Sequence, residues 1–340
     1  MSFLVRQTLM FAIPLMIVAL AGVFAERSGI INLALEGIMI FGAFIGVIFV
    51  RTMQTWGWFE KAMQTNNWIA LQGYLLLAIL VVAIMGAVFS LLLAFAAINL
   101  SANQTIGGTA LNMLAPALVL FLVRIIANQN TLTIFNGGSA TYFMIKKANL
   151  GIESNSFFVE TFVNKAYITT YVVIIIYIVM SVILYKTKFG LRIRSCGENP
   201  QAADSLGINV ARMRYAGTVI SGALAGIGGF VFAVTSANTT SNGDVAGMGF
   251  LALAVMIFGN WKPLNIALGS LLFGLFKCIG VSYSTLDINN DGIARLAEIG
   301  VSPHFYRLLP YLITLVVLML TSKSSRAPKA EGIPYDKGQR

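Results

Sequence analysis

Long apolar runs separated by short polar stretches are the main feature of this sequence. A helix that crosses a bilayer needs about 20 mostly apolar residues, and nine windows approach or exceed that length. They cover 8–25, 33–50, 71–98, 107–127, 168–186, 214–234, 246–260, 264–284 and 305–321. Three are short or interrupted by glycine, so we expect some spans to be broken or partly re-entrant. The pattern predicts an all-α, polytopic membrane helix bundle of about eight or nine spans.

The composition excludes an ordinary soluble enzyme. Of the 340 residues, 57% are apolar and only 11% are charged, whereas a soluble domain carries about a quarter charged residues. The two cysteines, Cys196 and Cys278, are too few and too different in setting to make a disulfide framework, so we expect both to be reduced. They form no C-x-x-C pair, and we assign neither a function.

Basic residues set the expected orientation. The net charge is +10, and Lys and Arg concentrate at 186–214 and after residue 321. Cytoplasmic loops of membrane proteins are enriched in these residues, which accounts for the charge without a nucleic-acid partner. Four predicted spans separate the two basic stretches, so both fit in the cytoplasm. The N-terminus then lies outside, the C-terminus lies in the cytoplasm, and 128–167 and 285–304 are external loops.

The chain is expected to form one transmembrane domain over 1–321, with a cytoplasmic loop at 187–213. The basic tail 322–340 is expected to be cytoplasmic and disordered. The first apolar window leads directly into the second without a small-residue cleavage pattern, so we expect it to be kept as a span.

Two parts of the chain share short sequence patterns. LALEGIMIFG at 33–42 is similar to LALAVMIFG at 251–259, and Ala-Leu-Ala-Gly precedes each run, at 19–22 and 223–226. The expected orientation makes the first copy begin on an inward helix and the second on an outward helix, as in an inverted-topology repeat. The alternative is that short apolar sequences recur by chance.

The loop between the fifth and sixth windows contains signals for a short helix. Asn199 suits a helix N-cap, Pro200 suits the first helical position, and Gly207 suits the left-handed residue after a helix. These signals predict a two-turn helix at about 200–206. Because so short a helix is marginal alone in water, it either docks on a surface or is a capped turn that reverses the chain.

Four motifs, in order along the chain, resemble one family of transport proteins. They are ERSGIINLALEG at 26–37, GGTALNML at 107–114, the run GENPQAADSLGI at 197–208 with SGALAGIGG at 221–229, and LPYLIT at 309–314. This set, which covers most of 8–321, resembles the permease subunits of ABC importers for branched-chain amino acids, simple sugars and nucleosides. Within that family it is most similar to the nucleoside and simple-sugar branch.

The resemblance implies a multi-subunit importer of nucleosides or related sugars that works by alternating access in the cytoplasmic membrane. Its partners would be a cytoplasmic ATPase, a second related permease and an external substrate-binding lipoprotein. A coupling helix would sit in a groove of the ATPase. The residues implied are Glu198, Asn199, Pro200, Gln201, Ala202, Ala203, Asp204 and Gly207. The segments 128–167 and 285–304 are long for the family.

The sequence contains no G-x-x-x-x-G-K-[ST] motif, so this chain is not expected to bind ATP phosphates in a P-loop. We expect no cofactor on this chain, with ATP and Mg²⁺ bound by the partner ATPase. An alternative is an ion-coupled secondary transporter in which Glu36 carries the proton or cation. A membrane-embedded lipid enzyme would need clustered catalytic groups, and the sequence offers only scattered ones.

Polar and aromatic residues within the apolar windows are candidates for the solute pathway. A charge at the centre of a membrane helix costs about 2.5–3.5 kcal/mol on insertion scales, which draws attention to Glu36, Arg124 and Lys277. The pathway candidates are Asn32, Glu36, Phe41, Asn112 and Phe250. The alternatives are that Glu36 bonds backbone groups at a bend or pairs with a basic residue, that Asn112 joins helices, and that the aromatic residues pack.

One external stretch matches the calcium-loop pattern D-x-[DN]-x-[DN]-G-x5-E. Asp287, Asn289, Asp291 and Glu298 would supply the oxygen ligands, and Gly292 the turn. Ala294 and Arg295 are atypical for such a loop, so a polar turn is the alternative. His304, the only histidine, is expected to lie at the membrane boundary.

Overall fold

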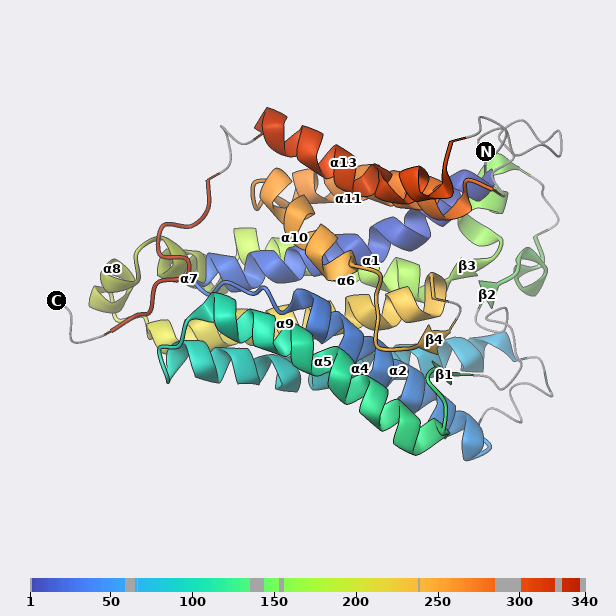
Figure 1. Ribbon diagram of the computed structural model, residues 1–340, viewed down its shortest axis with the longest axis horizontal. Helices are drawn as coiled ribbons and strands as arrows, with labels where there is room; N and C mark the ends of the chain where they lie inside the picture. Colours follow the sequence, from blue (N-terminus) through green and yellow to red (C-terminus); the bar gives the residue numbers. More distant parts are fainter. Residues whose placement is uncertain are drawn as a thin grey trace.

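Seven helices are long and apolar enough to cross a membrane in the part of the chain that the computed structural model describes. The described residues are 2–58, 65, 67–134, 144–152, 156–237, 239–284, 301–321 and 326–336. The seven are α1 (Ser2–Arg27), α2 (Leu35–Thr55), α4 (Trp68–Ile98), α5 (Gln104–Ala127), α6 (Ile168–Lys186), α9 (Val210–Thr235) and α11 (Pro263–Ser282). The prediction of an all-α membrane bundle is confirmed (Figure 1).

The window at 246–260 does not form one continuous spanning helix. It forms α10 (Met248–Phe258), whose 11 residues extend over only about 16 Å at 1.5 Å per residue. Asn260 and Trp261 follow with positive φ and end the helix. α10 therefore covers only about half of a hydrocarbon core about 30 Å thick, and the irregular residues before it complete the crossing (Figure 1). The last window forms α13 (Pro303–Thr321), and its crossing stays a prediction.

The two ends of the bundle carry different short elements (Figure 1). The end with the start of α1 carries β1 (Leu132–Thr133), β2 (Met144–Ile145), β3 (Ala166–Tyr167), β4 (Thr240–Ser241), the 3₁₀ helix η2 (Lys147–Leu150) and the π-helical η3 (Val159–Val163). β1 pairs antiparallel with β4, and β2 with β3. The opposite end carries α7 (Lys188–Glu198) and α8 (Pro200–Ser205), which we call the coupling end.

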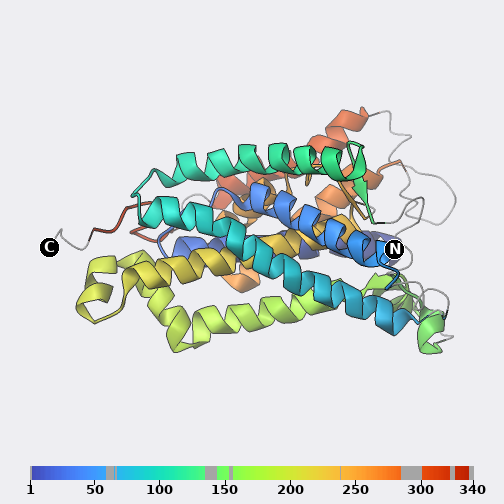
Figure 2. The same cartoon turned by 90° about the horizontal axis from the view of Figure 1, so that it is seen from below.

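α9 runs through the centre of the bundle and packs against α1, α2 and α4 (Figure 2). Small residues permit this packing, as is usual for helix contacts in membranes. A Cβ atom at Gly42 of α2 would overlap the carbonyl oxygen of Gly226 in α9. The two backbones therefore touch directly, and this contact needs glycine.

The two similar sequence runs lie in equivalent structural units. In each unit a 26-residue helix, α1 or α9, leads through an irregular stretch to a second helix, α2 or α10. α1 and α9 are antiparallel, because Gly217 of α9 lies near Phe24 while Gly228 lies near Val18. The units also exchange contacts: Gly226 of α9 packs on α2, and Gly22 of α1 packs on Met256 of α10. This is the arrangement expected of an inverted repeat.

Part of the tail differs from the expectation of disorder. Residues 326–336, which we call the tail strap, follow a defined path beside α7 and α8 (Figure 1, dark red). The backbone N–H of Ala330 donates to the carbonyl oxygen of Gly197, and that of Gly332 to Gly29. These bonds satisfy strap donors, and the Ala330 side chain is buried. The expectation is therefore corrected for these residues.

The glycine contact between α2 and α9 gives the first prediction. Gly42→Ala should lower the free energy of unfolding by about 1–3 kcal/mol, because the methyl group has no room beside the α9 backbone. Gly73→Ala in α4 is the matched control, since nothing lies within 4 Å of its Cβ position. Thermal unfolding of the purified protein in detergent measures both. Equal stability of the two variants would contradict the packing described.

Candidate functional site

Residues next to α8 in the sequence cap both of its ends. The side-chain oxygen of Asn199 accepts a hydrogen bond from Ala202 N at 3.0 Å, and Pro200 occupies the first turn. At the other end Gly207 has φ +81°, its N–H donates to Asp204 O, and Ile208 N donates to Ala203 O. This pair of bonds around a left-handed glycine is a Schellman motif. The helix predicted at about 200–206 is confirmed as Pro200–Ser205.

α8 docks on its own protein through one face and leaves the other open. Ala203 is buried in an apolar cluster with Cys196 of α7 and Val210 of α9. Burial raises the pKa of the Cys196 thiol, which keeps it in the neutral, unreactive form. On the open side Gln201, Ala202 and Ser205 are exposed, and the Leu206 residue that follows α8 is 81% exposed. Of the expected coupling residues, Ala203 is therefore structural, whereas its neighbours face outward.

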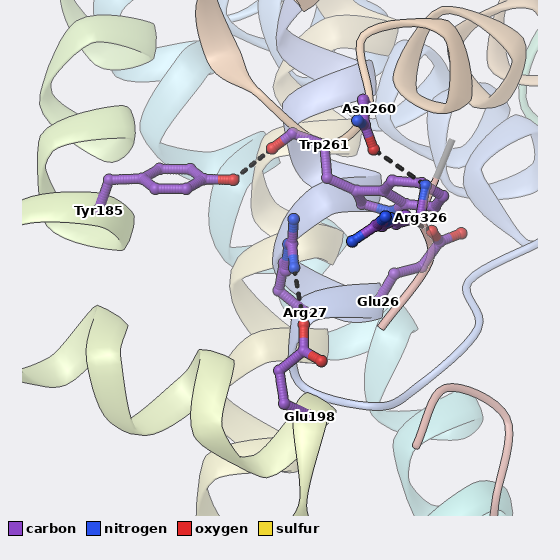
Figure 3. Close-up of polar contacts among 7 residues, drawn as sticks. All are labelled: Glu26, Arg27, Tyr185, Glu198, Asn260, Trp261 and Arg326. Atoms are coloured by element: carbon purple, nitrogen blue, oxygen red, sulfur yellow. Dashed lines mark hydrogen bonds and ion pairs between the residues drawn. The ribbon is translucent and has the colours of Figure 1, made fainter. Parts of the chain in front are cut away.

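α7 is fixed to the end of α1. A Cβ atom at Gly197 would overlap the carbonyl oxygen of Arg27, so the two backbones are in direct contact. The Arg27 guanidinium also forms an ion pair with Glu198, at 3.1 Å (Figure 3). Glu198, expected to bind the ATPase, thus has a partner within this chain.

A second set of contacts joins the same end of α1 to the turn between α10 and α11 (Figure 3). The indole N–H of Trp261 donates to the buried carboxyl group of Glu26 at 2.6 Å. The Tyr185 hydroxyl of α6 donates to Trp261 O, and the backbone N–H of Arg326 donates to Asn260 Oδ1 at 3.1 Å. Sequence reasoning missed these contacts, because 235 positions separate Glu26 from Trp261.

In the middle of the bundle, Glu36 binds the beginning of α10. Its carboxylate accepts hydrogen bonds from the N–H groups of Gly247 at 3.0 Å, Gly249 at 2.5 Å and Phe250 at 3.3 Å. A carboxylate at a helix N-terminus satisfies donors that have no partner within the helix. This geometry matches the alternative in which Glu36 bonds backbone groups at a bend.

Of the other pathway candidates, three make contacts inside the bundle and one is exposed. Asn112 accepts from Gly37 N and donates to Leu33 O, so it caps the start of α2. Asn32 donates to Ser221 in α9, and the ring of Phe41 is buried and stacked on Phe89. Phe250 is 53% exposed, at the start of α10. Among the five candidates it therefore offers the most accessible surface.

The remaining candidates are two basic residues, a histidine, a cysteine and the residues of the calcium-loop pattern. Lys277 donates to Ala246 O, and Arg124 donates to Asn130 near the end of α5. His304 is exposed, and Cys278 is buried and unpaired. The calcium-loop candidates Asp287, Asn289, Asp291 and Glu298 lie outside the described residues. Within the described ranges, no group of three or more His, Cys, Asp or Glu side chains could hold a metal ion.

Glu331 of the tail strap makes the strap sensitive to pH. Burial raises the pKa of this carboxyl group from its usual 4.5 to about 7, and the positive charge of Arg27 opposes the shift only in part. A docked carboxyl group with a raised pKa holds its proton more tightly than an undocked one. Docking therefore takes up protons, and it is expected to weaken as the pH rises from about 4.5 through about 7.

A nitroxide label attached through Ala327→Cys tests the direction of this pH dependence. The label reacts at this site because both native cysteines are buried. Label mobility should rise between pH 5 and pH 8 in the otherwise unchanged protein. Glu331→Gln, which cannot ionise, should keep mobility low and constant across the range. The same pH response in both proteins would contradict the assignment of the titrating group.

Comparison with known proteins agrees with the motifs. The model of the family described as "Branched-chain amino acid transport system / permease component" matches residues 4–318. The nucleoside ABC transporter permease protein NupC of Lactococcus lactis subsp. cremoris is 39% identical over 100% of this chain and 98% of its own length. The guanosine ABC transporter permease protein NupQ of Bacillus subtilis is 37% identical over the same shares.

A more distant relative, the nucleoside ABC transporter permease protein NupB of Lactococcus lactis subsp. cremoris, is 24% identical over 97% of this chain and 83% of its own length. No solved structure matches the chain. The family match covers nearly all of the membrane bundle, and the full-length relatives are permease subunits rather than enzymes. This chain therefore belongs to the family of multi-pass membrane permeases of ABC importers, which work with an ATPase and a substrate-binding protein.

Proposed function

We propose that this chain carries nucleosides into the cell as one of two related permeases of an ABC importer. The observation that carries the proposal is the identity of 39% and 37%, over the whole chain, to permeases named for nucleosides and for guanosine. A relative named for glucose is only 28% identical. ATP and Mg²⁺ would bind to the partner ATPase, and the substrate-binding partner would be an external lipoprotein.

The second permease is supported by the pair of relatives from one organism. NupC and NupB of Lactococcus lactis subsp. cremoris are both named nucleoside permeases, and both match almost all of this chain. We therefore favour a heterodimer over two identical copies. The solute would pass between the two subunits, where an exposed ring such as Phe250 can stack on a nucleobase.

The expected orientation is supported by the segments that share one end of the bundle. α7, α8 and the tail strap lie together at the coupling end, and α1 begins at the opposite end (Figure 1). Both basic stretches of the sequence begin or lie at the coupling end, which favours the cytoplasm for that end. The N-terminus is then external.

α8 is the element best suited to receive the ATPase. It has a docked face at Ala203 and an open face, and Leu206 places an apolar side chain in water beside it. Leu206 follows a capped helix beside its open face, and we take it as the apolar contact that the ATPase would cover.

Leu206→Asp tests the role of α8. Copurification of the ATPase with a tagged copy of this chain should fall at least tenfold, because the charge replaces an apolar contact. Leu150→Asp is the matched control, since Leu150 is 45% exposed and belongs to η2, which is not part of the coupling end. It should leave ATPase copurification unchanged. Normal copurification with Leu206→Asp would contradict the docking of the ATPase on α8.

Uptake measurements test the solute. In cells that depend on this importer, unlabelled nucleosides should inhibit uptake of labelled guanosine at concentrations at least tenfold below those of leucine, ribose or glucose. Collapse of the ion gradients with ATP maintained should leave uptake intact. Equal competition by leucine or a free sugar would show that the solute is misassigned, and loss of uptake with the gradient would favour ion coupling.

A further inference from the structure

The tail strap crosses the coupling end and touches every element that holds α8. Its backbone bonds Gly197 at the end of α7 through Ala330 N at 2.9 Å, and Gly29 after α1 through Gly332 N at 3.2 Å. Its Tyr335 ring packs on the apolar cluster of Cys196, Ala203 and Val210, from α7, α8 and α9. The strap and the buried face of α8 therefore share one small core.

A buried arginine gives the strap a fixed position. Arg214, near the start of α9, is only 2% exposed, and its guanidinium donates to Ile333 O at 2.9 Å. Two of its other nitrogen atoms find no hydrogen-bond partner among the described residues. Because a buried charge without acceptors is costly, removing the strap carbonyl would leave Arg214 worse satisfied than it is now.

An open groove lies between the strap and the beginning of α8. It has a volume of about 220 Å³, with residues 198–201 on one wall and Lys329, Ala330 and residues 333–336 of the strap on the other. Ile333 on the strap wall is 56% exposed, although its carbonyl oxygen is held by Arg214. Lys329 and Asp336 add one charge of each sign. An exposed apolar side chain with mixed charges around it fits a folded protein partner better than an anionic membrane surface or a nucleic acid.

The size of α8 explains why a second wall is needed. Its six residues extend over about 9 Å, whereas a stable protein interface takes about 800 Å² and 20 or more residues from each partner. A protein that binds the open face of α8 must therefore also contact its neighbours. The strap is the neighbour that shares a groove with α8, and Ile333 is an apolar anchor comparable to Leu206.

We propose that strap residues 329–336 form the second wall of the ATPase-docking groove, so that the ATPase binds a composite surface of α8 and the tail strap. This inference rests on the proposed function of α8. It assigns the tail a direct contact with the ATPase, in addition to its packing against this chain.

Three charge substitutions in the complete importer test the proposal. Ile333→Asp changes the strap wall, Leu206→Asp changes the α8 side, and Ala327→Asp is the control, because Ala327 is exposed on the same segment outside the groove. Each variant is purified from its membrane complex through a tag on this chain, and the ATPase retained per permease is measured. The melting temperature of the permease is recorded in parallel.

Ile333→Asp should retain at least tenfold less ATPase than the unchanged protein, with an unchanged melting temperature, and Ala327→Asp should stay within twofold. If Leu206→Asp loses the ATPase while Ile333→Asp retains it, the strap proposal is wrong and the function of α8 stands. If both retain it, the α8 assignment fails as well. Equal losses in Ile333→Asp and Ala327→Asp would also overturn the proposal, because the effect would not depend on the groove.

A photocrosslinking residue placed at Ile333 identifies the partner directly. Illumination of the assembled importer should join this chain to the ATPase, and the yield should fall when Leu206→Asp is added. A crosslink only to a second permease, or only to lipid, would overturn the proposal.

Discussion

Backbone groups that end inside a membrane need partners from the protein, and much of this structure meets that requirement. α2 and α10 both begin within the bundle after an irregular stretch, so their first N–H groups have no acceptor within their own helices. Glu36 accepts hydrogen bonds from three N–H groups at the start of α10, and Asn112 accepts one at the start of α2. Broken helices are tolerated in a bilayer only when such partners exist. The first role of these polar residues in the apolar windows is therefore to bond backbone groups that the fold would otherwise leave unsatisfied.

The half-helix α10 links the middle of the bundle to the coupling end. Its beginning is bound to Glu36 of α2, and the turn after it is bound to Glu26 of α1 through Trp261. Phe250 lies at the first of these attachments and the coupling segment adjoins the second. A movement of α7 and α8 that is carried to α1 thus acts on an element whose far end carries the candidate solute contact. In the proposed importer this connection would carry movement from the coupling end to the solute pathway.

The sequence predicted features that depend on neighbouring residues better than those that depend on distant ones. The capping signals at Asn199, Pro200 and Gly207 are local, and the helix they predict is present within one residue. The apolar window at 246–260 forms only the 11-residue helix α10, because hydropathy does not reveal the positive φ of Asn260 and Trp261 that ends it. Likewise, the basic composition of the tail suggested disorder, while its order depends on Arg214, more than 100 positions away.

Contact between Gly197 and the Arg27 carbonyl has a mechanical consequence. Where two helices meet through side chains, rotamer changes can absorb a displacement of several tenths of an ångström before either backbone moves. Here main chain touches main chain, with no side chain between them. Any push on α8 therefore reaches α1 with little loss, and the stiffness of the coupling end is set by a residue that has no side chain at all.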